Sequence, residues 1–306
     1  MTTETLTEWV QHLTTVISDR TKNHYSVSSL EQALAAIRWL HKQAKQSAPD
    51  DTDARALIRA HGKRQSDGGR KIRRSAIVTP EQVADVVAQC DIATLTGLRD
   101  RFIVVTSFSA WTRRSELSAL NISDIGEDQG DLVIFFRSSK TDQAGQGEEV
   151  RLKPREDLLC PLTAWREYRA ALAMHGIVTG RALRRIDRWG NIDPGKDSGY
   201  AAGMSPATIN DITKKLTAAA GCDTDGFGRK VTAHGWRASG YSAAKKNGAS
   251  SEAARKHGRW SERSGIPDRV YDRAQDPHTE NPMAAVPLVP AQRNDTADVE
   301  TSPRQR

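Results

Sequence analysis

Apolar residues at helical spacing run through most of this 306-residue chain, and one short region alone has the pattern of β-strands. Leu30, Leu34 and Ile37, for example, are spaced three or four residues apart and so share one face of a helix. Residues 132–136 and 149–152 are strand-like, and the polar segment between them contains two glycines. We therefore expect a mainly α fold with a small antiparallel β-hairpin or sheet.

The first part of the chain has the pattern of helices. The helix that contains Leu30 begins at Ser28 or Ser29 and places Leu40 and His41 on the same apolar face. We expect three helices in this part, two within residues 5–46 and one over residues 52–63.

A basic segment with a Gly68-Gly69 pair follows and has the composition of a linker between domains. Beyond it, Thr79 is placed to cap a helix whose first residue is Pro80. Further helices are expected over residues 161–174, 205–220 and 233–246. The predicted organisation is a helical N-terminal domain (1–65), a basic linker (66–77), a larger domain (78–278) and a flexible C-terminal tail (279–306).

Composition favours a polyanionic partner and argues against several other classes. The net charge is +7 and the pI about 9.4, which suits nucleic acid or an anionic membrane surface. The three cysteines are scattered and fit neither a zinc spacing nor a disulfide framework. No segment has the roughly 20 apolar residues of a membrane span or the pattern of a signal peptide. We expect a soluble protein of a reducing, intracellular compartment.

Six residues stand in an order that suggests phosphodiester chemistry. A tyrosine phenol is a weak nucleophile at its usual pKa of about 10, so it needs cations arranged around the phosphorus before it can attack. No metal-ligand motif is present in the sequence to supply that charge. The candidate catalytic residues are Arg113, Lys140, His234, Arg237, Trp260 and, as nucleophile, Tyr271.

Arg113 and Glu116 are three residues apart at the start of a predicted helix, so Glu116 can hold the guanidinium in place as a supporting residue. Arginine suits a phosphate because its planar fork donates two parallel bonds. An ordinary surface salt bridge is the alternative. Lys140 lies just past the first strand, where it can reach DNA and donate a proton, or be a solvated turn lysine.

His234 and Arg237 share one face near the start of a helix that Thr232 can cap, where the helix dipole favours an anion. The indole N–H of Trp260 can donate to a phosphate oxygen, although a tryptophan is also a common core residue. Tyr271 can likewise be either a nucleophile or a core cap. The complete ordered set favours the catalytic interpretation.

In these motifs the chain resembles the tyrosine recombinases of the phage integrase family. Arg113-x-Ser115-Glu116-Leu117 is similar to the family's first arginine motif, and Ser139-Lys140-Thr141-Asp142-Gln143 to its lysine hairpin. His234-x-x-Arg237, Gly258-Arg259-Trp260 and Tyr271 complete the set. The resemblance covers about residues 76–275, and the three preceding helices resemble the latter part of the family's N-terminal DNA-clamping domain.

The chain departs from the family pattern in three ways. The N-terminal domain, of about 75 residues, is shorter than usual. Trp260 stands where many members have histidine, which places the chain in a tryptophan-bearing subset, with His257 as a competitor for that role. The separation between Trp260 and Tyr271 is about two residues longer than usual, and residues 264–267 are expected to absorb it as a loop.

The resemblance implies that Tyr271 attacks a scissile phosphate and forms a 3′-phosphotyrosyl bond. Arg113, Arg237 and Trp260 would bind the non-bridging oxygens. Lys140 would protonate the leaving 5′-oxygen, and His234 would assist proton transfer at the phenol. No cofactor, metal or ATP is implied, because the covalent bond conserves the energy of the phosphodiester. Exchange of strands would pass through a Holliday junction.

The resemblance also implies partners and a shape. The two domains would form a C-shaped clamp on double-stranded DNA that carries a specific site. The protein would be a monomer in free solution and a homotetramer on synapsed DNA. It would act in the cytoplasm, at the nucleoid, without contact with a membrane. Alternatives are a catalytically inactive, architectural DNA-binding relative, or a type IB topoisomerase-like or telomere-resolving enzyme. The basic linker would follow the phosphate backbone, or be only a charged linker. Its candidate DNA-binding residues are Arg64, Arg70, Lys71, Arg73 and Arg74.

Overall fold

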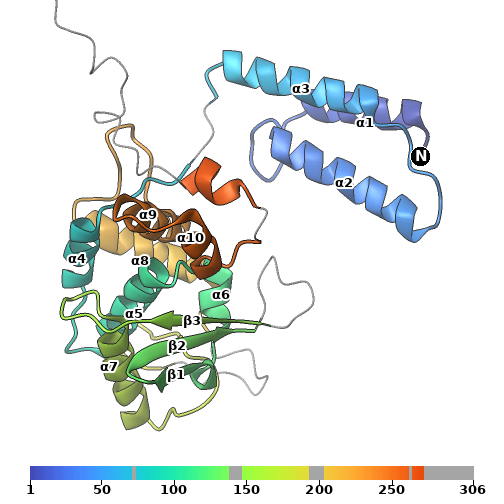
Figure 1. Cartoon of the computed structure of the whole chain (residues 1–306). Helices are drawn as coiled ribbons and strands as arrows, with labels where there is room; N and C mark the ends of the chain where they lie inside the picture. Colours follow the sequence, from blue (N-terminus) through green and yellow to red (C-terminus); the bar gives the residue numbers. More distant parts are fainter. Residues whose placement is uncertain (71–73, 138–146, 193–202, 262–263, 272–306) are drawn as a thin grey trace, which may run out of the picture. The chain divides into compact units, whose positions relative to one another are not determined.

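The computed structural model describes residues 1–70, 74–137, 147–192, 203–261 and 264–271 (Figure 1). Contacts divide the chain into two compact units, 1–74 and 75–306. The prediction of a mainly helical chain with a small antiparallel sheet is confirmed, whereas the C-shaped clamp stays a prediction. Within the described ranges, no helix is both long and apolar enough to cross a bilayer.

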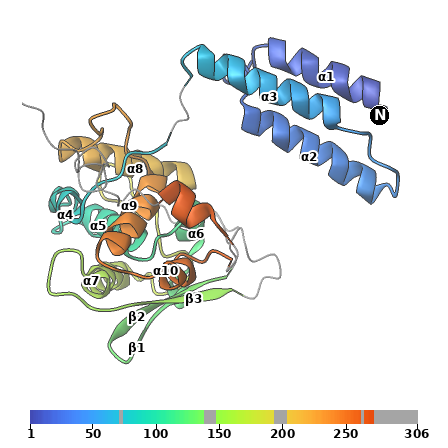
Figure 2. The same cartoon turned by 45° about the horizontal axis from the view of Figure 1, so that its top comes forward.

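The N-terminal unit is a bundle of three helices, α1 (Thr3–Thr15), α2 (Val27–Gln43) and α3 (Thr52–Asp67) (Figure 2). Ser26 caps α2, so this helix begins earlier than the predicted Ser28 or Ser29. Leu40 is 57% exposed, and its predicted place on the buried face is wrong. The core of the unit is small and consists of Leu6, Val10, Leu30, Leu34, Ala54 and Ile58.

Helix α3 is one turn longer than predicted. Its backbone hydrogen bonds continue as far as the amide of Gly68, which donates to the carbonyl of Arg64. Gly69 then adopts a φ of +80°, a left-handed conformation that glycine tolerates and that ends the helix. Arg64 therefore belongs to α3 and not to an irregular linker.

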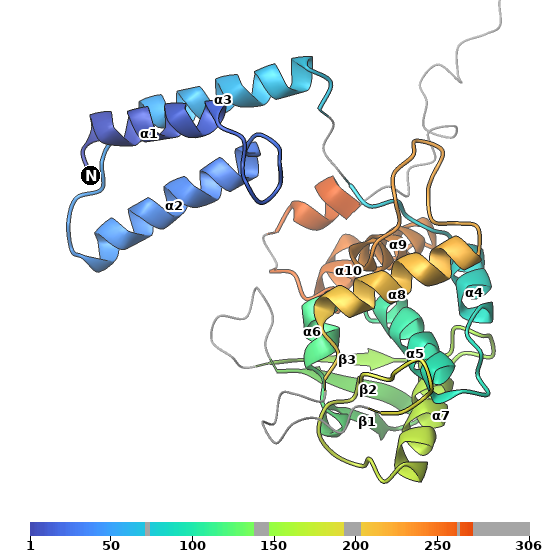
Figure 3. The same ribbon diagram turned by 180° about the vertical axis from the view of Figure 1, so that it is seen from behind.

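The second unit is built around helix α5 (Leu95–Ser109), which is buried along most of its length (Figures 1 and 3). It packs against α4 (Pro80–Ala88), α7 (Pro161–Met174) and α9 (Ala233–Lys246). Thr79 caps α4 with a complete capping box, as expected from the Thr-Pro start. The other α-helices in the described residues of this unit are α6 (Arg114–Ala119), α8 (Pro206–Ala219) and α10 (Ser251–His257).

The sheet has three antiparallel strands in the order β1 (Ile125–Asp128), β2 (Asp131–Phe136) and β3 (Glu148–Leu152). The sequence indicated β2 and β3 but not β1. Only Ile125 of β1 is buried, so the strand has no alternating apolar pattern to reveal it. The β1–β2 turn has positive φ at both Gln129 and Gly130, as a tight hairpin requires.

The chain that enters the second unit is anchored alongside α9. The amide of Ala76 donates to the carbonyl of Lys230, and the amide of Val78 donates to the hydroxyl of Ser239 at 2.9 Å. Because Ser239 lies in α9, the second bond fixes the helix that carries His234 and Arg237 against the start of the unit.

Candidate active site

Helix α9 carries two of the predicted residues, His234 and Arg237, and its start is held by neighbouring side chains. Thr232 occupies the N-cap position of this helix, but the prediction that its side chain caps the helix is wrong. Its hydroxyl instead forms a bond of 3.0 Å with the hydroxyl of Ser75. The amide of Ala233 donates to the side chain of Asn210, which satisfies one of the first N–H groups of the helix.

Arg237 is fully buried, with 0% of its surface exposed. Its guanidinium donates to the backbone carbonyls of Trp111 and Gly258. The ring of Trp260 covers it, with 3.9 Å between the guanidinium carbon and the ring centroid, a cation–π contact. The Nε of Arg237 has no hydrogen-bond partner in the described structure, so its donors are not all used.

The carbonyl of Trp111 reaches Arg237 because the backbone there is strained. Trp111 has a φ of +49°, a left-handed conformation that is uncommon for a large side chain. Its indole lies directly against Gly240 of α9, where an added Cβ would be 2.3 Å from the indole nitrogen. A glycine at position 240 is thus what allows Trp111 to adopt this position.

Arg113 and Glu116 form the ion pair expected from their three-residue spacing. The carboxylate of Glu116 also accepts a bond of 2.9 Å from Arg259. The side chain of Glu116 is only 4% exposed, so the alternative of a surface salt bridge is wrong. The buried arginines Arg237 and Arg259, together with the partly exposed Arg113, form a group that we call the arginine cluster.

The sequence interpretation gave Arg259 no role. Arg259 has a φ of +56°, and this left-handed backbone directs its guanidinium toward Glu116 and the carbonyls of Ala110 and Trp111. Nothing in the sequence predicts a left-handed arginine. The one available signal was its place between Gly258 and Trp260 in a motif already singled out.

The arginine cluster is short of negative charge. Burial, together with the positive charges of Arg113 and Arg259, lowers the pKa of Arg237 to about 9. Burial alone would raise the pKa of Glu116, but the charges of Arg259 and Arg113 outweigh it and hold the pKa below its ordinary value. In the described part of the chain, the carboxylate of Glu116 bonds to Arg113 and Arg259, and Glu148 adds a second negative charge that acts on Arg259, so three positive charges face two negative ones. A bound anion would relieve this excess.

Tyr271 lies at the end of a short π-helical turn, Pro267–Tyr271. Its hydroxyl is 2.8 Å from Nε2 of His234, and its ring packs 5.4 Å from the ring of Trp260. The hydroxyl of Ser242 donates to its backbone carbonyl at 2.8 Å. Pro267 lies in this turn, so the expectation that residues 264–267 form a loop is wrong at Pro267.

Trp260 and His257 face different parts of the unit. Trp260 contacts both Arg237 and Tyr271, as described above. Nε2 of His257 instead donates to the carbonyl of Ser109 at 2.7 Å, and its ring lies against Trp111. Burial lowers the pKa of His257. Of the two candidates, it is thus Trp260 that lies against Tyr271 and Arg237, and its catalytic role stays a prediction.

The structure thus brings Arg113, His234, Arg237, Trp260 and Tyr271 together with Glu116. Lys140 lies outside the described residues, as do Lys71 and Arg73. Among the residues that are described, no three His, Cys, Asp or Glu side chains are arranged to hold a metal ion. The cysteines Cys90, Cys160 and Cys222 are buried free thiols.

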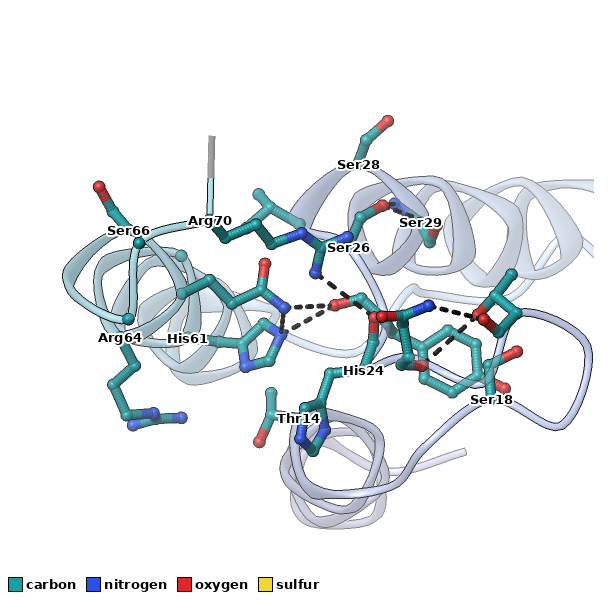
Figure 4. Close-up of a pocket in the computed structure, with 18 of the residues that line it drawn as sticks. Thr14, Ser18, His24, Ser26, Ser28, Ser29, His61, Arg64, Ser66 and Arg70 are labelled. Carbon is teal, nitrogen blue, oxygen red and sulfur yellow. Dashed lines mark hydrogen bonds between the residues drawn. The ribbon is translucent and has the colours of Figure 1, made fainter. Parts of the chain in front are cut away.

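The N-terminal unit contains a polar hollow of about 1540 Å³ between the start of α2 and the end of α3 (Figure 4). Arg20, Arg64 and Arg70 are among the residues that line it. Among its lining residues, Tyr25 accepts hydrogen bonds of 2.9 Å at its backbone carbonyl from the side chains of His61 and Gln65. Two of the predicted DNA-binding residues, Arg64 and Arg70, therefore border one basic hollow, while Arg74 lies outside its lining.

Comparison with known proteins gives a consistent fold. No protein-family profile matches the chain. An integrase/recombinase XerD homolog of Selenomonas ruminantium is 27% identical over 131 residues, which cover 42% of this chain and 35% of the relative. The match thus spans about a third of the relative's length.

Two solved structures cover nearly all of the chain. The XerH site-specific recombinase bound to a palindromic difH substrate, a post-cleavage complex, has a TM-score of 0.59 at 14% identity, over 93% of this chain and 72% of that one. The XerA recombinase has a TM-score of 0.50 at 14% identity, over 92% and 88%. Similarity at this level of identity establishes the fold.

Proposed function

We propose that this chain, which has the fold of the Xer recombinases, is itself a site-specific DNA recombinase or integrase. It would cleave a DNA strand, hold it as a 3′-phosphotyrosyl ester, and rejoin it to a different 5′-hydroxyl through a Holliday junction. The observation that supports this function best is the 2.8 Å contact between the Tyr271 hydroxyl and His234, beside the arginine cluster.

Tyr271 is the proposed nucleophile. A phenol is a weak nucleophile while it keeps its proton, so a neighbouring base must accept that proton as the oxygen attacks. Nε2 of His234 is within hydrogen-bond distance of that oxygen. In the proposed step the phenolic oxygen bonds to phosphorus, the bond from phosphorus to the 5′-oxygen breaks, and Lys140 supplies the proton that the 5′-oxygen gains.

The arginine cluster is the proposed phosphate site. The attack adds negative charge to the non-bridging oxygens, and preorganised donors stabilise that charge most effectively in a buried setting. Arg113 and Arg237 would bind these oxygens, while Glu116 and Arg259 hold the cluster in place. Trp260 now lies over Arg237, so its ring would move aside or donate its N–H when the phosphate enters. This role of Trp260 would place the chain in the tryptophan-bearing subset of the tyrosine recombinases.

The covalent ester conserves the energy of the broken bond, so the reaction needs neither ATP nor a divalent metal. Recombination cuts two duplexes at four places, which calls for a homotetramer on synapsed DNA and is compatible with a free monomer. We place the protein in the cytoplasm, at the nucleoid.

The N-terminal domain (1–65) would complete a C-shaped clamp around double-stranded DNA. Arg64 and Arg70, with Arg20, border a polar hollow of a kind that suits backbone phosphates. Such contacts give affinity and salt dependence but little choice of sequence. Lys71, Arg73 and Arg74 of the linker (66–77) would continue the same path.

Covalent capture tests this function. A pool of nicked duplexes with randomised sequence is incubated with the protein, and strands that survive denaturation while attached to it are recovered and sequenced. We expect one recurring site, and Tyr271→Phe should trap nothing. Tyr168→Phe is the matched control, because Tyr168 is a buried tyrosine whose hydroxyl donates to the carbonyl of Ala182.

Other results would contradict the proposal. Capture without a preferred sequence, together with relaxation of supercoiled DNA, would indicate a type IB topoisomerase-like enzyme. DNA binding without capture would indicate a catalytically inactive architectural protein.

A further inference from the structure

The turn that carries Tyr271 is held in place by a carboxylate within the same turn. Asp268 lies three residues before Tyr271, and its Oδ1 accepts a bond of 2.7 Å from the hydroxyl of Tyr241. The same oxygen is 3.1 Å from the hydroxyl of Ser251, and Oδ2 accepts a bond of 2.6 Å from Arg255. One side chain of the turn thus receives three side-chain donors.

These donors come from the two helices beside the turn. Tyr241 lies on α9, four residues after Arg237 and therefore on the same side of the helix. Ser251 and Arg255 lie in successive turns of α10. Asp268 consequently ties the nucleophile's turn to the helix that supplies Arg237 and His234.

The opposite end of the turn is fixed separately. The hydroxyl of Ser242, also on α9, donates to the carbonyl of Tyr271 at 2.8 Å. The ring of Tyr241 lies 6.2 Å from that of Tyr271, so the same residue contacts the nucleophile and bonds to Asp268. A five-residue π-helical turn has few backbone hydrogen bonds of its own, and these side-chain bonds determine where it sits.

We propose that Asp268 is a positioning residue, which holds the Tyr271 hydroxyl against His234 and in line with the arginine cluster. The inference rests on the proposed function. Asp268 touches neither His234 nor the cluster in the described structure, so it acts through the turn. The hydrogen bond from Tyr241 and the hydrogen bond and charge of Arg255 lower the pKa of Asp268 below its ordinary value, so these donors favour the charged carboxylate.

If Asp268 positions only Tyr271, its loss should impair one reaction of the site, cleavage, and spare another, ligation. Cleavage uses the phenol of Tyr271 and therefore needs the turn in place. Ligation of a strand that ends in 3′-(p-nitrophenyl phosphate) does not: a DNA 5′-hydroxyl attacks the phosphorus, p-nitrophenolate leaves with the electron pair, and the hydroxyl proton passes to a base or to water. That second reaction needs the arginine cluster but not Tyr271.

The test compares both reactions in Asp268→Asn and in Tyr241→Phe, the second being a milder change that removes only the hydroxyl donor. The cleavage probe is the nicked duplex recovered by covalent capture, and the ligation probe has the same sequence with the p-nitrophenyl ester. We expect single-turnover cleavage to fall roughly 10²-fold in Asp268→Asn, the scale of a misplaced reacting group, and less in Tyr241→Phe. DNA affinity and the ligation rate should stay at the wild-type level, which also shows that the variants are folded.

Asp187→Asn is the matched control, because Asp187 also accepts three hydrogen bonds in the same unit, from Trp189 and Asn191, away from the turn. Equal losses of cleavage and ligation would overturn the inference, because Asp268 would then support the whole site. Wild-type cleavage in both variants would overturn it too. If the wild-type protein ligates and cleaves but the variants behave as the control does, only the positioning role fails. If the wild-type protein does neither, the proposed function fails and the inference with it.

Discussion

Replacing Glu116 by glutamine removes the carboxylate that bonds to both Arg113 and Arg259. The side chains of Glu116 and Arg259 are 4% and 2% exposed, so solvent does little to screen the loss. Removing one partner of a buried ion pair typically costs 3–5 kcal/mol. Because glutamine keeps an oxygen acceptor of the same shape, we expect the lower end, about 3 kcal/mol. For a unit of this size that corresponds to a fall in Tm of about 10 °C.

The pH dependence of this difference has a definite sign. The folded-state pKa of Glu116 lies below its ordinary value, which for glutamate is about 4.3. The stabilisation is therefore complete above that ordinary pKa and is lost as the pH falls through the folded-state value. Wild type and Glu116→Gln should differ fully at neutral pH and converge in acid, where the wild-type side chain is also neutral.

Thermal unfolding monitored by circular dichroism at a series of pH values measures both effects. Glu149→Gln is the matched control, because Glu149 pairs with Arg151 at an exposed position, with its side chain 48% exposed, and should change stability little. Equal stability of wild type and Glu116→Gln at neutral pH, or a difference that widens in acid, would refute the reasoning about the buried cluster.

Three further changes test two residues of the active site and the basic residues of the N-terminal unit. Gly240→Ala places a Cβ 2.3 Å from the indole nitrogen of Trp111 and 2.4 Å from the carbonyl oxygen of Phe108, and should destabilise the protein by roughly 1–3 kcal/mol through overpacking, measured by thermal unfolding; a neutral effect would show that both the indole and the backbone at Phe108 shift at no cost. His234→Gln should lower single-turnover cleavage by about 10²–10⁴-fold with DNA affinity unchanged, and an equal loss of affinity would argue against a role in proton transfer. Replacing Arg64 and Arg70 by alanine should reduce the slope of log K against log salt by about 1 for each DNA phosphate that the protein no longer neutralises, in titrations with duplex DNA, and an unchanged slope would remove them from the interface.

The sequence predicted those parts of the site that depend on regular spacing. His234 and Arg237 lie on one face of α9 because a three-residue separation brings side chains together in any helix. The same spacing predicted the pair of Arg113 and Glu116. The proximity of Tyr271 to these residues could be expected only from the resemblance, because no local rule relates positions so far apart in the chain.

The parts that were missed depend on irregular backbone. Trp111 and Arg259 both have positive φ, and this conformation is what joins Arg259 to Glu116 and Arg237 to the carbonyl of Trp111. Neither residue type favours the left-handed region, so composition gives no warning. Strand β1 was missed for a different reason, because it is held by backbone pairing with β2 and buries only Ile125.

The identity of the residue that becomes attached to DNA tests the central claim most directly. The covalent complex captured on the nicked duplex is digested with nuclease and trypsin, and the peptides are analysed by mass spectrometry. We expect a nucleotide linked through its 3′-phosphate to Tyr271 and to no other residue. A nucleotide on a different side chain, or a captured complex that persists in Tyr271→Phe, would contradict the proposed mechanism.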